Sequence, residues 1–307
     1  MASFCHPIAN LYRMTIIDLH SHSTRSDGLE TPTEVFENAA ASGVSILALT
    51  DHDTTSGWAE AAETAKRLGL GFVPGIELTT RARFVKDGET RRVSIHLLAY
   101  LPDPTNQALL TTMAESVASR EVRARAMVDL LGKDFEITWD LVMAELADEA
   151  TIGRPALADA LVRAGAVADR TEAFAGILSK NGGYYVPTVV IETLDAIKLV
   201  LDAGGVPVIA HPLTGIGAET ERGDLPLDHF EQLIGAGLAG FEVYHREVPD
   251  IAREWLLDLA KKHDLIVTGS SDYHGVNGKP NRLGENYTDP EMLQRIIAQS
   301  SGTAALL

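Results

Sequence analysis

Seven short apolar runs, most of them separated by a helical pattern, constrain the fold of this chain more than any other feature. Runs such as SILALT and GVPVIA are apolar almost throughout, which suits strands that are covered on both faces. The alternation of strands with helices predicts an α/β fold with a mainly parallel sheet, either a barrel or a doubly wound sheet. The expected strands are residues 14–19, 45–49, 70–76, 93–100, 206–210, 240–243 and 265–268.

Helical patterns fill most of the intervals between these runs, and one interval is much longer than the others. The expected helices are 32–41, 58–68, 194–202, 227–234, 251–262 and 290–298. Residues 102–187 contain helical patterns but no convincing strand, and they therefore predict an inserted helical subdomain. The expected organisation is an N-terminal extension at 1–13, an α/β domain formed by 14–101 and 188–307, and the helical insertion at 102–187.

The charge and the cysteine content limit the partners and the compartment of the protein. The 307 residues include 43 acidic residues against 26 Lys and Arg, and the net charge of −17 argues against a groove for long nucleic acid. A small anionic substrate fits only where metal ions or a few arginines reverse this field. Cys5 is the only cysteine, which excludes a disulfide framework. No window resembles a membrane span or a secretory signal, so we expect a cytoplasmic protein without a membrane partner.

Histidines and carboxylates collect where the expected strands end. Seven of the ten histidines lie at or just beyond the C-terminal end of a run: His20, His22, His52, His96, His211, His245 and His274. The carboxylates that accompany them are Asp27, Asp51, Asp53, Glu77, Glu242 and Asp272. In parallel α/β folds functional groups gather at the carboxyl ends of the strands, because the loops there converge on one mouth. These residues therefore predict a functional site at the mouth.

Two pairs of residues at positions i and i+2 give this group the geometry of a metal centre. His20 with His22, and Asp272 with His274, can each present two ligands to one point, because alternate residues of a strand face the same side. Imidazole and carboxylate together suit Mn²⁺, Fe²⁺ or Zn²⁺, and the absence of thiolate ligands argues against a closed structural zinc site. The candidate ligands are too many for one ion and predict two or three.

The motifs at these positions resemble those of the polymerase and histidinol phosphatase (PHP) superfamily of metal-dependent phosphoesterases. DLHSHSTRSDG, LALTDHDT, VPGIELTT, IHLLAY, VIAHP and SSDYH stand in the family's order and cover nearly everything from residue 16 to residue 274. The resemblance implies a distorted seven-stranded β/α barrel that holds up to three divalent ions. The ligands that it implies are His20, His22, Asp27, His52, Glu77, His96, His211, Asp272 and His274.

The resemblance also divides these ligands among three ions. It assigns His20, His22, Glu77 and Asp272 to one ion, Glu77, His96 and His211 to a second, and Asp27, His52 and His274 to a third. Glu77 is thereby implied as the ligand that two ions share.

The insertion resembles that of one branch of the superfamily. Its segments IGRPALADALV and YYVP, followed by AGGVPVIAHP, are similar to the branch that removes the 3′-phosphate from nucleoside 3′,5′-bisphosphates or trims the 5′ ends of short RNA. Histidinol phosphatases are similar in the ligands but not in this insertion. Hydrolysis of an amide or a cyclic phosphate stays open as an alternative, and so does a non-catalytic module that binds metal and nucleotide.

Formal charges predict how such a site would treat a phosphate ester. Three ligand carboxylates and three divalent ions sum to about +3, so the mouth attracts a phosphate although the protein is negative. A water that bridges two ions would have a lowered pKa and would attack phosphorus in line. The leaving oxygen needs a proton, for which His245 and Asp53 are the candidates. The alternative for both is a hydrogen bond that orients a metal ligand.

Basic residues of the insertion are the candidates for holding the rest of the substrate. Pro155 is expected at the first position of a helix, so free backbone N–H groups and the positive end of the helix dipole lie beside Arg154. Arg154 is therefore predicted to bind a phosphate, with Lys180 as the candidate for a second contact. Arg120, Arg123 and Arg125 are expected to form a solvated helix face with local ion pairs.

Overall fold

The computed structural model describes residues 15–144, 146, 152–214 and 225–307. The expected extension at residues 1–13, which includes Cys5, lies outside the described residues. Within them the strands are β1 (Ile16–Asp18), β2 (Val44–Leu49), β3 (Gly71–Lys86), β4 (Glu89–Tyr100), β5 (Val206–Ile209), β6 (Gly240–Tyr244) and β7 (Ile266–Gly269). The helices are α1 (Pro32–Ala41), α2 (Trp58–Leu68), α3 (Gln107–Leu131), α4 (Trp139–Met143), α5 (Arg154–Arg163), α6 (Arg170–Ala175), α7 (Thr193–Asp202), α8 (Leu227–Gly235), α9 (Asp250–Lys262) and α10 (Pro290–Gln299). No helix in these ranges has the length and apolarity to cross a membrane.

The seven strands form one sheet in the order β1 to β7. β4 runs against its two neighbours, so its pairs with β3 and β5 are antiparallel, whereas the other four pairs are parallel. The two edges of the sheet meet at one end, where a bridge joins Ser21, after β1, to Tyr273, after β7. The predicted seven-stranded α/β architecture with a mainly parallel sheet is confirmed, and β4 is the one strand that runs against its neighbours.

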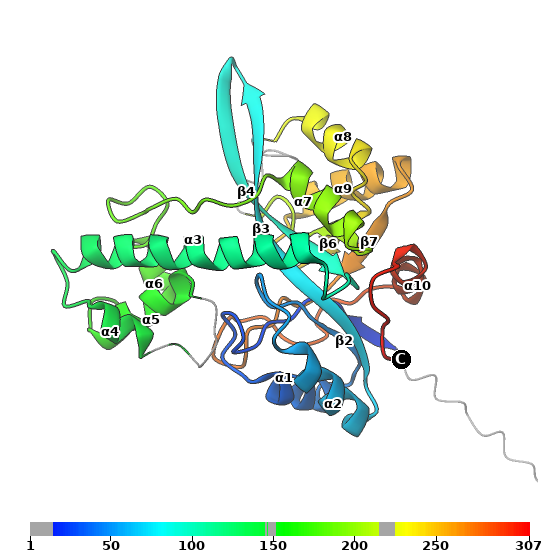
Figure 1. Ribbon diagram of the computed structural model, residues 1–307, viewed down its shortest axis with the longest axis horizontal. Helices are drawn as coiled ribbons and strands as arrows, with labels where there is room; N and C mark the ends of the chain where they lie inside the picture. Colours follow the sequence, from blue (N-terminus) through cyan, green and yellow to red (C-terminus); the bar gives the residue numbers. More distant parts are fainter. Residues whose placement is uncertain (1–14, 145, 147–151, 215–224) are drawn as a thin grey trace, which may run out of the picture.

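β3 and β4 continue beyond the sheet as a two-stranded arm, residues 81–94, which stands away from the other strands in Figure 1. The expected strands at 70–76 and 93–100 cover only the inner parts of β3 and β4. The turn of the arm is Asp87 and Gly88, with φ of 54° and 78°, values that a type I′ hairpin turn requires. An Asp-Gly pair between two alternating segments is a strong hairpin signal, so the arm was predictable from the sequence.

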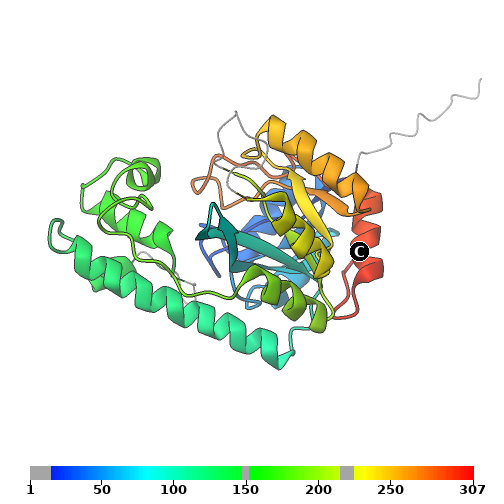
Figure 2. The same cartoon turned by 90° about the horizontal axis from the view of Figure 1, so that it is seen from above.

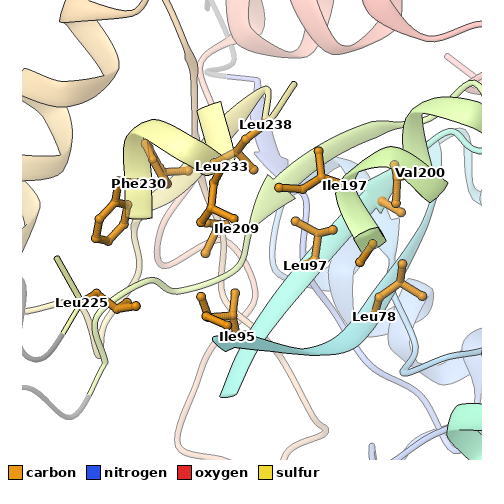
Figure 3. Close-up of a cluster of buried hydrophobic side chains, with 14 of the residues drawn as sticks. Leu78, Ile95, Leu97, Ile197, Val200, Ile209, Leu225, Phe230, Leu233 and Leu238 are labelled. Atoms are coloured by element: carbon orange, nitrogen blue, oxygen red, sulfur yellow. The ribbon is translucent and has the colours of Figure 1, made fainter. Parts of the chain in front are cut away.

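Side chains pack on both faces of the sheet, as the apolar runs predict. On one face Leu97 and Ile209 pack with α7 and α8, the arrangement that Figure 3 shows. On the other face Leu98 and Val208 pack in a second core with Ile296 of α10. Consecutive residues such as Leu97 and Leu98 are both fully buried, because successive side chains of a strand point to opposite faces.

Helices α3 to α6 lie to one side of the sheet in both views (Figures 1 and 2). The described residues between 102 and 187 contain no strand, in agreement with the expected helical patterns. These helices have an apolar core of their own, which includes Met127 and Leu157. The long helix α3 belongs to two cores, since Leu109 and Met113 pack with the sheet and Leu131 packs within the insertion. The division of the chain into domains stays a prediction.

Candidate metal centre

Nine histidines and carboxylates converge at one end of the sheet, and we call them the His/Asp/Glu cluster. Its members are His20, His22 and Asp27 after β1, His52 after β2, Glu77 in β3, His96 in β4, His211 after β5, and Asp272 and His274 after β7. Each member lies 2.8 to 3.8 Å from at least one other. The structure therefore brings together all nine residues that were predicted as ligands, and their binding of metal stays a prediction.

Glu77 and His96 reach the cluster from inside their strands, not from the strand ends where they were expected. β3 passes through the cluster and continues into the arm, so Glu77 has strand residues on both sides. β4 returns through the cluster in the opposite direction, with His96 opposite Thr79 of β3. The hairpin explains both differences, because a reversed strand brings an interior residue to the edge where parallel strands end.

Glu77 is the centre of this arrangement. Its side chain is only 1% exposed. Its Oε2 lies 3.0 Å from His22 Nε2, 3.2 Å from His20 Nε2 and 3.3 Å from His52 Nδ1, and its Oε1 lies 2.8 Å from His96 Nδ1 and 3.2 Å from His211 Nε2. Oε2 is buried without a hydrogen bond although three ring nitrogens surround it. A buried carboxylate oxygen in this setting suits a cation between the rings.

Three groups of ligand atoms within the cluster are compact enough to surround one ion each. Their members are His20, His22, Glu77 and Asp272; His22, Asp27 and His52; and His52, Glu77 and His96. The first group is the first ion's predicted ligand set. The other two groups differ from the predicted sets, because His52 takes the place of His211 in one and His22 takes the place of His274 in the other. His211 and His274 still lie near these groups, with His211 3.2 Å from Glu77 and His274 3.3 Å from Asp27. The division of the ligands among three ions stays a prediction.

The electrostatics of the cluster favour a positive charge. Burial opposes the ionised carboxylates, but neighbouring imidazoles hold the pKa of Glu77 and Asp27 well below their usual range. Burial likewise opposes a charge on His22, yet the hydrogen bonds that its ring donates to Asp272 and Glu77 raise its pKa to about 9. The carboxylates therefore stay ionised and make the centre attractive to cations.

A further carboxylate, Glu242 of β6, contacts two cluster residues, His20 and His211, and orients them. It is fully buried, and its Oε1 lies 3.0 Å from His20 Nδ1 while Ser270 Oγ donates to the same oxygen at 2.6 Å. Its Oε2 accepts the backbone N–H of His211 at 2.7 Å. A carboxylate on the outer nitrogen of a ligating imidazole fixes the ring's tautomer and direction. In the sequence Glu242 stands out only as a single acidic residue inside an apolar strand, and this pattern does not reveal its hydrogen bond to His20.

His245, one candidate for the proton donor, is fully buried beside the cluster. Its Nδ1 accepts the backbone N–H of Glu247 at 3.2 Å, which leaves the ring proton on Nε2. That nitrogen lies 3.7 Å from Asp272 Oδ2. His245 is therefore placed to contact a predicted ligand, and its action as the proton donor stays a prediction.

Asp53, the other candidate, joins the cluster to the insertion. Its carboxylate accepts hydrogen bonds from Ser116 Oγ at 2.9 Å and from Arg120 at 2.7 Å, both on α3, and from the backbone N–H of Thr79 at 3.2 Å. Arg120 also donates to the Thr79 hydroxyl. Asp53 follows His52 directly, so this contact ties α3 to a cluster residue.

The expectation of a solvated arginine face on α3 is correct for Arg125 alone. Arg125 is exposed and pairs with Glu121 one helical turn earlier. Arg120 is only 11% exposed, in the ion pair with Asp53, and Arg123 donates from Nε to the carbonyl of Val186. Arg120 and Arg123 face inward because α3 packs against the sheet and the insertion along that side, which spacing along one helix could not reveal.

A cavity of about 500 Å³ opens between the cluster and the insertion. Asp27, His52, His96 and His211 line one side of it, and Arg81 and Ser94 of the arm line another. The insertion also contributes to the lining, through residues that we call the insertion wall: Arg123, Arg154, Lys180 and Tyr185. The two predicted substrate-binding residues, Arg154 and Lys180, are therefore on the same cavity as the cluster.

Arg154 begins α5, with Gly153 as the N-cap, so Pro155 is the second helical residue and not the first. Its guanidinium donates to the carbonyl of Leu178 at 3.3 Å and lies over the ring of Phe174 at 5.1 Å. Burial lowers the pKa of Arg154, and burial together with Arg154 lowers the pKa of Arg123 to about 10. Two neighbouring cations that lack a carboxylate partner among the described residues leave this wall open to an anion.

Lys279 is a cavity residue that sequence reasoning missed. Its Nζ lies 2.7 Å from Asp272 Oδ2, and its side chain lines the cavity near Asp27. Burial opposes its charge, but Asp272 and Asp27 raise its pKa above the usual range. No spacing marks a lone lysine in a loop, and only its place five residues after His274 hints at the site.

Comparison with known proteins identifies the family. A family model described as the PHP domain matches residues 18–172. The chain is also 34% identical to the 3′,5′-nucleoside bisphosphate phosphatase of Chromobacterium violaceum, over 85% of this chain and 88% of that protein. The chain belongs to the PHP family.

Other relatives in the PHP family carry different names. The chain is 32% identical to the phosphoribosyl 1,2-cyclic phosphate 1,2-diphosphodiesterase of Eggerthella lenta (88% of this chain, 98% of that protein). It is 30% identical to the 5′-3′ exoribonuclease Rnm of Salmonella typhimurium (84% of this chain, 85% of that protein). A crystal structure from Bifidobacterium adolescentis, named as a candidate metal-dependent phosphoesterase, superposes with a TM-score of 0.85 at 42% identity, over 94% of this chain and 97% of that one.

The PHP assignment and the cluster agree on the chemistry. All of these relatives are named for the hydrolysis of phosphate esters, and the protein is a PHP metal-dependent phosphoesterase. The cluster offers imidazole and carboxylate donors at 2.8 to 3.8 Å from one another, with the buried Oε2 of Glu77 at its centre. This donor set fits divalent ions of the borderline class.

Proposed function

We propose that this protein hydrolyses the 3′-phosphate of nucleoside 3′,5′-bisphosphates. One observation carries the proposal: residues of the His/Asp/Glu cluster and the basic insertion wall line a single cavity of about 500 Å³. A cavity of this volume is of the size that binds a small ligand. The relative from Chromobacterium violaceum is named for the same reaction.

The cluster is proposed to bind the phosphate that is cleaved. Divalent ions held there supply a Lewis acid for the phosphate oxygens and lower the pKa of water to give a nucleophile. The predicted ligands would hold those ions, and Glu77 would serve as a ligand for two of them. Glu242 fixes the ring of His20 from behind, and Lys279 adds a cation beside Asp272.

The insertion wall is proposed to bind the second phosphate. Arg123 and Arg154 contact backbone carbonyls and aromatic rings, and no carboxylate partners them among the described residues. A cation with neutral partners can exchange them for a phosphate without breaking an ion pair. Arg154 also stands at the N-terminus of α5, where backbone N–H groups favour an anion.

The proton for the leaving oxygen is proposed to come from His245 or Asp53. The ring proton of His245 on Nε2 points toward Asp272 and supports the first choice. The carboxylate of Asp53 is already engaged by Arg120, Ser116 and Thr79, which supports a structural role for it instead. Replacement of each residue separates the two, because loss of a proton donor slows only substrates with poor leaving groups.

The proposal is tested by phosphate release from a panel of substrates. We expect adenosine 3′,5′-bisphosphate to be hydrolysed with a higher kcat/KM than 3′-AMP, 5′-AMP, histidinol phosphate or a cyclic phosphate. Elemental analysis of the same preparation should find two or three ions of Mn, Fe or Zn per chain, and chelation should abolish the activity. Preference for a cyclic phosphate or for histidinol phosphate would replace the proposal. An active enzyme with less than one ion per chain would contradict the role of the cluster.

The second candidate function is removal of nucleotides from the 5′ end of short RNA. The relative from Salmonella typhimurium is named as a 5′-3′ exoribonuclease, and the cavity opens beside the arm, whose Arg81 and Ser94 line it. The same panel with a 5′-phosphorylated trinucleotide separates this reaction from the first. Release of mononucleotides would identify an exonuclease, and release of inorganic phosphate would identify a phosphatase.

A further inference from the structure

The β3–β4 arm carries a row of arginines on one face. Residues at alternate positions of a strand share a face, so Arg81 and Arg83 lie on the same side of β3 as Glu77. On β4 the residue opposite Arg81 is Ser94, and the residue opposite Arg83 is Arg92. One continuous sheet face therefore runs from the cluster, past the cavity, to the outer part of the arm.

Two of these arginines directly face each other across the strands. Arg83 and Arg92 are paired in register and both are exposed. Directly opposed side chains of an antiparallel pair are only about 5 Å apart at Cβ, and like charges in this position destabilise the pair. Neither arginine has an ion pair or a side-chain hydrogen bond among the residues that the structure describes. The neighbouring Arg91, on the other face, pairs with Glu89 at 2.9 Å.

The opposite face of the arm explains why the arginine face stays accessible. Phe84 and Ala82 are buried in the core beside α7 and α8, and Phe84 contacts the ring of His229 on α8. The arm is therefore fixed by its apolar face, and its arginine face points away from that packing. The protein has a net charge of −17. Two arginines without ion pairs on a fixed arm therefore make the electrostatic potential locally positive on an otherwise negative protein.

We propose that Arg83 and Arg92 form a phosphate-binding surface for the chain of a short single-stranded oligoribonucleotide whose 5′ end lies in the cavity. The inference rests on the proposed function for the position of that end. Arg81 lines the cavity and belongs to the same face, so a strand that leaves the cavity along the arm meets Arg83 and Arg92 next. Guanidinium groups bind phosphates in bidentate fashion, and the pair's mutual repulsion is relieved when an anion lies between them. A short substrate with two phosphates ends in the cavity and does not reach this surface.

Binding is measured separately from hydrolysis, by fluorescence anisotropy of a 3′-labelled, 5′-phosphorylated RNA pentanucleotide in EDTA. We expect R83Q/R92Q to weaken binding at least tenfold. The plot of log K against log salt should become shallower by about 0.7, since the one phosphate that lies between the two arginines is lost and each phosphate contact on a single strand contributes about 0.7 to the slope. R83K/R92K keeps both charges and should bind within a few-fold of the unchanged protein.

The matched control is K66Q/K261Q, which removes two charges from exposed positions on α2 and α9. This variant should bind the pentanucleotide as the unchanged protein does. Hydrolysis of adenosine 3′,5′-bisphosphate by R83Q/R92Q, with metal restored, should stay within twofold. If both double variants weakened RNA binding equally, the effect would come from the net charge and the proposal would be overturned. Unchanged RNA binding by R83Q/R92Q would also overturn it.

Two further measurements distinguish an RNA surface from a protein-binding surface, and the surface from the proposed function. If an acidic peptide bound in a way that depends on Arg83 and Arg92, and RNA did not bind, the surface would be a binding site for a protein and not for an oligonucleotide. If the bisphosphate is not hydrolysed but RNA binding still depends on Arg83 and Arg92, the proposed function is wrong and the surface is supported. If the bisphosphate is hydrolysed and the pentanucleotide does not bind, the proposed function is supported and the surface is wrong.

Discussion

The two sides of the cavity carry their charges in opposite ways. In the His/Asp/Glu cluster every imidazole lies within 4 Å of a carboxylate, and both kinds of group are buried together. On the insertion wall, Arg123 and Arg154 contact only carbonyls and aromatic rings among the described residues. The first side is suited to hold cations permanently, and the second is suited to bind an anion that comes and goes. The difference shows that residue charge alone does not define a site, because the partners decide which ligand can enter.

Replacement of Glu77 by Gln should have the largest effect and tests the cluster side. Gln keeps the shape but removes the charge that five imidazoles surround, so we expect kcat/KM to fall about a thousandfold, or about 4 kcal/mol in the barrier. Circular dichroism and thermal melting should show a folded protein. A variant with more than about a tenth of the original rate would contradict the bridging role of Glu77.

Replacement of Asp53 by Asn tests the joint between the two sides. The carboxylate forms a buried ion pair with Arg120, and loss of one partner leaves a buried charge, so we expect the free energy of unfolding to fall by about 3 kcal/mol. Urea unfolding measures this change, and the matched control is Asp129→Asn, since Asp129 lies on an exposed part of α3. Equal stability of the two variants would show that Asp53 does not tie α3 to the cluster.

Replacement of Arg154 by Glu tests the insertion wall. A charge-assisted contact with phosphate contributes about 1.5 to 3 kcal/mol, so we expect kcat/KM for the bisphosphate to fall tenfold or more. Nitrophenyl phosphate, which has no second phosphate, should be hydrolysed nearly as before. Equal losses for both substrates would assign Arg154 to the fold of the insertion, and no loss for either would assign it to the solvated surface.

Replacement of Arg125 by Gln should have the smallest effect and sharpens the comparison within one helix. Arg125 lies two residues after Arg123 on α3, but its pair with Glu121 is exposed. Such pairs contribute about 0.3 to 0.5 kcal/mol, and the guanidinium also lies over the ring of Trp139 at 3.9 Å, a contact that contributes about 0.5 to 1 kcal/mol. We therefore expect the free energy of unfolding to fall by about 1 kcal/mol and kcat/KM to stay within twofold. Arg123→Gln is the partner experiment, in which kcat/KM for the bisphosphate should fall. Similar kinetics for both variants would mean that Arg123 does not contact the substrate.

Much of the fold was predictable because the strands are apolar on both faces and the helices have clear limits. The expected helix 58–68 coincides with α2, and β5 and β7 lie within or close to the expected runs. The direction of β4 was not predictable from apolar runs, since a buried strand has the same pattern in either direction. Only the Asp-Gly turn of the arm contains that information.

The cluster was predictable to a greater extent than the cavity. Residues such as His20 and His22 are close together in sequence and stand at strand ends, so spacing and motif place them. The partners of Asp53 and Asp272 are Arg120 and Lys279, which lie 67 and 7 residues further along the chain. Their roles depend on how α3 and the last loop fold back on the sheet, and no local pattern carries that information.

The long helix α3 has a consequence for how such an enzyme changes its substrate over evolution. Leu109 and Met113 anchor its first turns to the sheet, and Met127 and Leu131 anchor its last turns in the insertion. At 1.5 Å per residue, its 25 residues carry the second anchor about 37 Å from the start of the helix. Mutations near that far end can change the insertion wall, which is proposed to bind the second phosphate, without altering the residues that anchor the helix to the sheet. Descendants of one ancestral hydrolase can therefore diverge in specificity while they keep the same chemistry.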